Sequence, residues 1–219
     1  ELAQQREKLA VLNRLVRHNL RHEAQYLLGA KSQVASADDP DERAAISSDI
    51  GEIADQLTEM HDTLDRTQDI IRRSDRSNTG VDLEPIVGTV VSEYRESHPE
   101  ASITVDVPEG LAVSAGTELR NVLEELIENA VVYAERTPEI EITARERNGR
   151  IRLTVSDRGP GIPEPDRSVI TREADIDQMT HAQGLGLWFV RWAMDAYDGT
   201  FDLETGEEGT TITLVFSSA

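Results

Sequence analysis

The spacing of apolar residues changes character part of the way along the chain. From Leu2 to Ser36 they recur with the 3.6-residue period of an amphipathic helix. From Ile46 to Ile71 they alternate steps of four and three, which is the heptad pattern of a helical seam. The polar stretch 37–41, which includes Pro40, separates the two runs. Residues 1–77 are therefore predicted to form a helical hairpin.

A lone hairpin of this kind leaves much of its apolar seam exposed to water. Two copies that pair into a four-helix bundle would bury the seam, so the pattern predicts a homodimer. A hairpin that packs within a monomer is the alternative reading, and the sequence leaves it open.

Beyond residue 77, short alternating runs typical of β-strands are interleaved with helical stretches. The expected strands span 102–107, 139–145, 150–156 and 209–216, and the expected helices lie near 84–96, 116–134 and 184–197. The run 209–216 is expected to close the sheet as its last strand. Residues 78–219 are therefore predicted to form a second domain, a two-layer α/β sandwich, which makes the whole chain an α+β protein.

Charge narrows the range of partners. The chain has 42 acidic against 22 basic residues, a net charge of −20, and Lys8 and Lys31 are its only lysines. Nucleic acids and anionic membranes attract basic proteins, so neither is expected as a partner. High salt screens the repulsion within such an acidic surface, which predicts a salt-loving source. Most of the excess lies in residues 78–219, with 27 acidic against 11 basic side chains.

Two further features of the sequence concern the cellular location of the chain and whether it is a piece of a longer protein. There is no cysteine, and no apolar run approaches the roughly 20 residues that a membrane-spanning helix requires. A cytoplasmic location without disulfides is therefore expected. The sequence begins with Glu1 and has no leader-like start, so we expect it to be a piece of a longer protein.

A histidine on the first predicted helix is a candidate nucleophile. His18 lies about 180° from the apolar stripe, so its imidazole is expected to face solvent, where it could accept a phosphoryl group. Arg14, Arg17 and Arg21 concentrate positive charge around it. A plain surface histidine is the alternative reading. His22, which shares the outward side and precedes an acidic residue, is a second candidate acceptor.

Polar residues of the second domain point to nucleotide chemistry. Glu125 and Asn129 are one helical turn apart, and the amide oxygen of Asn129 suits a hard cation such as Mg²⁺. Asp157 precedes a turn that contains Gly159 and Gly161, and its carboxylate could accept a hydrogen bond from the amino group of adenine. A solvated helix face and an ordinary turn are the alternative readings of these two runs.

A third run, Gly184-Leu185-Gly186-Leu187, opens a predicted helix. Backbone N–H groups at a helix N-terminus can bind phosphates. The polar stretch 164–183 before it has the length and position of a lid over a nucleotide, and an ordinary surface loop is the alternative.

The order of these motifs resembles that of the sensor histidine kinases, most closely those of salt-loving archaea. Residues 17–21 look like the phosphoacceptor box, 125–129 like the N box, 157–161 like the first glycine box and 184–187 like the second. The resemblance covers nearly the whole chain. It implies a helical hairpin that dimerises into a four-helix bundle, followed by an ATP-binding domain of the type shared with gyrase.

The resemblance also implies roles for the motif residues. His18 would attack the γ-phosphate of ATP, and the phosphoryl group would pass to an aspartate in the receiver domain of a response regulator. A sensor domain upstream of the chain is implied as well. Asn129 would ligate Mg²⁺, and Asp157 would bind adenine. The remaining expected nucleotide-binding residues are Tyr133, Gly159, Gly161, Gly184, Leu185 and Gly186.

Several positions depart from the common pattern of that family. Asn19 follows the phosphoacceptor where many members have an acid that acts as base, Val132 replaces a basic residue before Tyr133, and no phenylalanine box is found in the lid. Glu125 stands where many members have a second Asn, and is expected to serve as the base or to promote ATP hydrolysis. Two alternatives stay open: a nucleotide-binding dimeric signalling module without kinase activity, and an ATPase.

Overall fold

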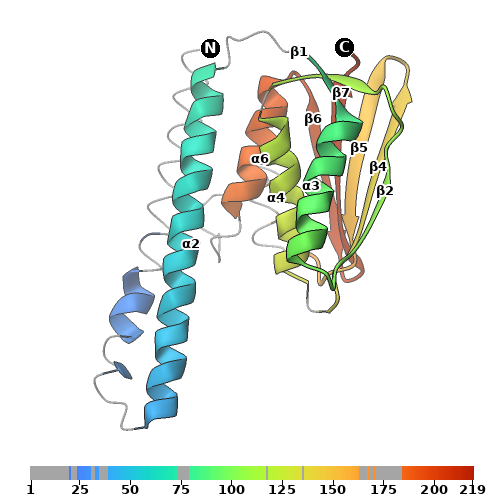
Figure 1. Ribbon diagram of the computed structural model, residues 1–219. Coiled ribbons are helices and arrows are strands. Elements are labelled where there is room, and N and C mark those ends of the chain that lie inside the picture. The colour runs from blue at the N-terminus through green and yellow to red at the C-terminus, as the bar shows by residue number, and fades with distance from the viewer. Residues whose placement is uncertain are drawn as a thin grey trace.

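The computed structural model describes residues 20, 24–30, 33–34, 39–73, 79–116, 118–134, 136–162, 167, 170 and 184–219. This part of the chain comprises a helical segment with the long helix α2 (Pro40–Arg73) and a layered α/β domain (Figure 1). The expected domain boundary between residues 77 and 78 stays a prediction.

Helix α2 confirms the second helical run of the sequence. Asp39 caps its start, since Asp39 Oδ1 accepts a hydrogen bond from the Asp41 N–H at 3.0 Å. Pro40 follows in the first turn, where the helix needs no N–H donor. The break that the sequence predicts at 37–41 is thus the start of α2.

The two helical segments contact each other as a hairpin. Buried Ala30 and Ile46 form a small apolar cluster, with Ile50 packed beside it. Residues 24–30 and 33–34 are helical, in agreement with the first predicted helix, whose other residues lie outside the described part of the chain. Within the described ranges, no helix combines the length and apolar character needed to cross a membrane.

The second half of the chain contains a mixed five-stranded sheet of order β2-β4-β5-β7-β6. Its strands are β2 (Ser102–Asp106), β4 (Glu139–Arg147), β5 (Arg150–Asp157), β6 (Thr200–Gly206) and β7 (Gly209–Ser217). β2 runs parallel to β4, and the other neighbours are antiparallel. β1 (Thr79–Asp82) and β3 (Ala112–Ala115) form a separate antiparallel pair.

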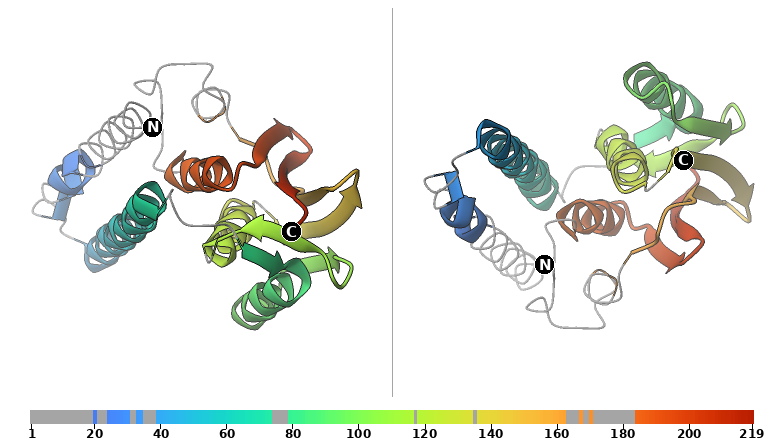
Figure 2. Two further views of the ribbon diagram at one scale, coloured as in Figure 1. Left: turned by 90° about the horizontal axis from the view of Figure 1, so that it is seen from above. Right: turned by 90° about the horizontal axis from the view of Figure 1, so that it is seen from below.

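Three helices cover one face of this sheet (Figure 1 and Figure 2). They are α3 (Leu83–Ser97), α4 (Leu119–Val132) and α6 (Gly184–Ala196). In α3, for example, Leu83, Val87 and Val91 recur on one side of the helix and are buried. The apolar sides of the three helices and the inner face of the sheet enclose the main hydrophobic core.

Helix α6 lies between the helical segment and the rest of the domain, with α4 in contact on one side and α2 on the other (Figure 2). Phe189 and Ala193 belong to the main core. Trp188 and Trp192 are also buried, but outside that cluster, and their ring centroids are 5.2 Å apart. The helix is therefore packed on both of its long sides.

From residue 39 on, the predicted helices and strands are present among the described residues, with ends shifted by a few residues. β7 is the last strand of the chain, as predicted, but it lies inside the sheet between β5 and β6 rather than at an edge. The short strands β1 and β3 and the acid-rich strand β6 are missing from the prediction. Alternation reports which face of a strand is buried, but it carries no information about which strand lies beside it.

Candidate functional site

The first group of predicted site residues lies on α4. Glu125 is only 7% exposed, although carboxylates are seldom buried. Asn129 Nδ2 donates hydrogen bonds to the main-chain oxygen of Glu125 at 2.6 Å and to Glu125 Oε1 at 3.3 Å. The two residues thus share one side of the helix, as their spacing predicts. Because the amide nitrogen is used in this way, the amide oxygen is the end of Asn129 suited to a cation.

Helix α6 leaves room for the Glu125 side chain because it has glycine at the facing position. A Cβ atom added to Gly186 would overlap the Glu125 carboxylate. The second glycine run therefore allows α6 to lie against α4 at the level of Glu125. Gly184 and Leu185 form the first turn of α6, as predicted, and the Leu185 side chain lies outside what the structure describes.

Asp157 ends β5, a strand with neighbours on both sides. Its Oδ1 accepts hydrogen bonds from the N–H groups of Gly159 at 2.7 Å and Thr210 at 3.3 Å. Burial raises the pKa of the Asp157 carboxyl above its ordinary value, and the two N–H donors partly oppose this shift. With Oδ1 occupied, Oδ2 is the oxygen that can accept a hydrogen bond from a ligand.

The glycine-rich turn after β5 is tied to the β6–β7 hairpin. Thr205 Oγ1 accepts a hydrogen bond from the Ile162 N–H at 2.7 Å and lies 3.2 Å from Thr210 Oγ1. Gly161 has a φ of +77°, and a Cβ atom there would overlap the carbonyl oxygen of Gly206. The turn therefore needs glycine both for its backbone conformation and for its close approach to the hairpin.

The sequence prediction missed the residues of this hairpin that support Asp157, namely Gly209 and Thr210, and missed Thr205, which supports the turn after it. Gly209 has a φ of +129°, and a Cβ atom there would overlap the main-chain oxygen of Asp157. A signal is present in the sequence, since Gly206 and Gly209 flank a two-residue hairpin turn. That signal marks a turn, but only the strand order brings the turn beside Asp157.

Tyr133 connects the two groups of residues. It follows α4 and is 40% exposed, and its main-chain oxygen lies 3.8 Å from the position that a Cβ on Gly159 would occupy. The end of α4 therefore reaches the first glycine turn, and α4 also contacts β5. Asn129, Tyr133 and Asp157 thus gather near the same end of β5.

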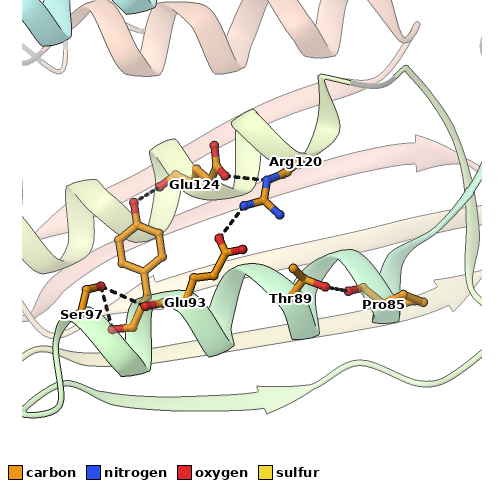
Figure 3. Close-up of polar contacts among 7 residues, drawn as sticks. Pro85, Thr89, Glu93, Ser97, Arg120 and Glu124 are labelled. Atoms are coloured by element: carbon orange, nitrogen blue, oxygen red, sulfur yellow. Dashed lines mark hydrogen bonds and ion pairs between the residues drawn. The ribbon is translucent and has the colours of Figure 1, made fainter.

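A polar network on another side of α4 joins it to α3 (Figure 3). Arg120 forms ion pairs with Glu93 at 2.5 Å and with Glu124 at 2.8 Å. The Tyr94 hydroxyl donates a hydrogen bond to the main-chain oxygen of Glu124 at 3.3 Å. Burial, with the nearby acids adding to it, raises the pKa of this hydroxyl, so it stays a donor. Exposed ion pairs contribute about 0–1 kcal/mol each, so the core packing mainly sets the position of α4.

The predicted phosphoacceptor lies outside the described residues. The same holds for His22 and for the three arginines around His18. Most of the predicted lid, 164–183, also lies outside them. The solvent exposure of His18 and its approach to the nucleotide stay predictions.

The C-terminal part of the chain matches a known protein family. Residues 115–219 match the family described as histidine kinase-, DNA gyrase B- and HSP90-like ATPases. Glu125, Asn129 and Asp157 all fall within this range. The candidate site therefore lies within the part of the chain that matches this family.

Comparison with individual proteins, over most of the chain, indicates a more specific class of protein. The chain is 33% identical to the sensor-like histidine kinase SenX3 of Mycolicibacterium smegmatis and 31% identical to SenX3 of Mycobacterium tuberculosis, in each case over 90% of this chain. It spans 55% and 52% of those proteins, about half of their length. The chain is thus homologous to sensor histidine kinases.

Solved structures agree on the fold. The nucleotide-free catalytic domain of the histidine kinase ThkA has a TM-score of 0.56 at 25% identity, with 64% of this chain and 97% of that domain covered. ThkA in complex with the response regulator protein TrrA has a TM-score of 0.72 at 20% identity, with 99% of this chain and 65% of that chain covered. The α+β fold that we expected is thus confirmed for the second half of the chain, and the structure adds that its sheet is mixed.

Proposed function

We propose that the chain is the dimerisation and catalytic core of a sensor histidine kinase. In this proposal it uses Mg-ATP to phosphorylate His18 and passes the phosphoryl group to an aspartate of a response regulator. The observation that carries the proposal is the half-buried Asp157 carboxylate, which stands beside a glycine turn and near the end of the helix that bears Glu125 and Asn129. The family match over this region supports an ATP ligand.

Each part of the site has a proposed task in binding Mg-ATP. Asp157 accepts a hydrogen bond from the adenine amino group through Oδ2. Asn129 holds Mg²⁺ through its amide oxygen, and the ion offsets negative charge on the phosphates. The first turn of α6 offers backbone N–H groups to the phosphates. The other residues proposed to contact or shape the nucleotide are Tyr133, Gly159, Gly161, Gly184, Leu185 and Gly186.

The proposed phosphotransfer requires a base near His18. Asn19, which follows it, carries no carboxylate. Glu125 is proposed as the base, because its carboxylate lies on the same side of α4 as Asn129. Domain rearrangement would bring His18 to the γ-phosphate for in-line attack.

The proposal also covers the oligomeric state of the kinase, its partner protein and its source. Residues 1–77 form the dimerisation hairpin, two copies of which make a four-helix bundle, and residues 78–219 form the catalytic domain. The contact of Ala30 with Ile46 supports such a hairpin. A response regulator docks beside His18 in this proposal, and the similar histidine kinase ThkA is known in complex with the response regulator protein TrrA. The acidic surface fits a salt-loving organism, and haloarchaeal kinases are the proposed relatives. The proposal also includes a cytoplasmic location and an upstream sensor domain.

Labelling with radioactive ATP in high salt tests the proposed reaction. Wild type should acquire a label that is labile in acid and stable in alkali, as expected for phosphohistidine. His18→Gln should acquire none, whereas the matched control His22→Gln should label as wild type does. Full labelling of His18→Gln, or loss of labelling in His22→Gln alone, would contradict the assignment of the acceptor.

A second candidate function is ATP hydrolysis, which the burial of Glu125 against α6 favours. A carboxylate held in this way could activate water instead of assisting His18. Steady phosphate release without a labelled protein, and its loss in Glu125→Gln, would identify an ATPase. Binding of ATP with neither labelling nor release would identify a signalling module that only binds nucleotide.

A further inference from the structure

The sheet face that lies away from the helices carries a concentrated set of positive charges. Side chains along β4 and β5 alternate between the buried core and this open face. The open side carries Arg145, Arg147, Arg150 and Arg152, all exposed. These four side chains are termed the arginine face. They account for four of the 11 basic residues in 78–219, a region with 27 acidic ones.

The strand register sets these arginines in two directly opposed pairs. Arg145 lies opposite Arg152, and Arg147 lies opposite Arg150. A two-residue turn with positive φ at both positions holds the hairpin in this register. Like charges placed directly opposite each other destabilise a sheet. A contribution to folding therefore does not account for the arginine face.

Most of the arginine face has no acidic partner among the residues that the structure describes. Arg145 pairs with Asp106 of β2. The other three form no ion pair or side-chain hydrogen bond within the part of the chain that the structure describes. Other arginines of this domain do meet acids, as Arg158 does with Glu139. Three guanidinium groups are thus left available in a domain rich in carboxylates.

A row of three threonines with an aspartate at each end lies next to the arginine face on the same side of the sheet. Thr143, Thr154 and Thr213 lie side by side in the row next to the arginines. Asp106, which pairs with Arg145, and Asp202 stand at the two ends of that row, on the edge strands β2 and β6. Glu141 and Glu204 come in the row beyond the threonines. The arginine face is therefore a positive island on an otherwise acidic domain.

We propose that the arginine face docks an extended acidic segment of a partner protein. Side chains two residues apart on a strand are about 6.6 Å apart, and neighbouring strands are about 4.8 Å apart. These two spacings set the dimensions of the arginine face. An extended segment with acids at alternate positions has the same spacing, and guanidinium groups bind carboxylates through paired hydrogen bonds. Nucleic acid or a membrane would extend over the acidic remainder of the domain and be repelled by it.

Binding of a fluorescent peptide of alternating Glu and Thr, followed by anisotropy with the whole 219-residue chain, tests this docking surface. Arg152→Gln should weaken binding by about fivefold, the loss of one favourable ion pair. The matched control Arg43→Gln changes the net charge equally but lies on α2, and should bind as wild type does. The triple variant Arg147→Gln, Arg150→Gln, Arg152→Gln should lose binding while its far-ultraviolet circular dichroism spectrum stays that of wild type, which shows that it is folded.

Several results would overturn the proposal. One is failure of the wild-type chain to bind the peptide at moderate salt, and another is unchanged binding in the triple variant. An equal loss of binding in Arg43→Gln would show that net charge alone explains the effect. A single-stranded oligonucleotide of equal charge that binds as tightly through the same arginines would assign the surface to phosphates instead. A peptide with Gln in place of Glu should not bind, and equal binding by that peptide would exclude carboxylate recognition.

Discussion

Replacing Asp157 by asparagine separates the structural from the ligand-binding task of this side chain. An asparagine Oδ1 can still accept the N–H groups of Gly159 and Thr210, which Asp157 Oδ1 accepts at 2.7 and 3.3 Å. The buried charge is removed. Because burial raises the pKa of Asp157, the ionised form costs stability, and the wild-type protein loses stability as pH rises above the ordinary value of 3.8 and through the raised one. At pH 7, Asp157→Asn should therefore unfold with a free energy at least equal to that of wild type.

The same substitution should weaken nucleotide binding strongly. With Oδ1 bound to the main chain, the asparagine Nδ2 takes the position of Oδ2 and presents a donor to the donor amino group of adenine. A hydrogen bond to a charged group is worth about 1.5–3 kcal/mol, so ATP affinity should fall roughly 10- to 100-fold.

Urea denaturation without nucleotide and calorimetric titration with ATP measure the two effects. Asp202→Asn, an exposed change on β6, is the matched control and should leave both quantities near wild type. ATP affinity within twofold of wild type would refute adenine recognition by Asp157. A clear loss of stability at pH 7 would refute the cost assigned to its buried charge.

Three further substitutions test the packing around the site. Gly186→Ala places a methyl group against the Glu125 carboxylate and should cost about 1–3 kcal/mol of unfolding free energy and slow phosphorylation; an unchanged urea midpoint would contradict this. Thr205→Val leaves the Ile162 N–H without its acceptor and should cost about 1–3 kcal/mol, while Thr205→Ser should restore stability. Tyr94→Phe removes one half-buried hydrogen bond and should cost about 0.5–1.5 kcal/mol with no change in calorimetric ATP affinity.

Local patterns were sufficient to predict most of the elements. Helix α2 was predictable because Pro40 marks its first turn and its apolar residues keep one period over many turns. The alternation along β4 and β5 likewise reports one buried and one open face. β6 was missed because acids occupy its outward positions and its buried side has few strongly apolar residues.

The candidate site was predictable only in part, because the local sequence does not always distinguish a site residue from similar residues beside it. Glu125 lies between Glu124 and Glu128 in sequence, and the side-chain chemistry of the three is the same. What distinguishes Glu125 is Gly186 on another helix, about 60 residues away, which leaves room for its carboxylate. The support of Asp157 by Thr210 depends in the same way on strand order, which no local pattern encodes.

The position of the aromatic pair on α6 has a practical consequence for experiments on signalling. Trp188 and Trp192 are the two tryptophans of the chain, and both are buried on the helix that α2 contacts. Indole emission responds to its immediate surroundings. Ultraviolet fluorescence of the unlabelled protein therefore reports on the junction between α2 and the α/β domain, with no background from tryptophans elsewhere in the chain. Any sliding or parting of α2 and α6 on ATP addition would be visible as a spectral shift in real time.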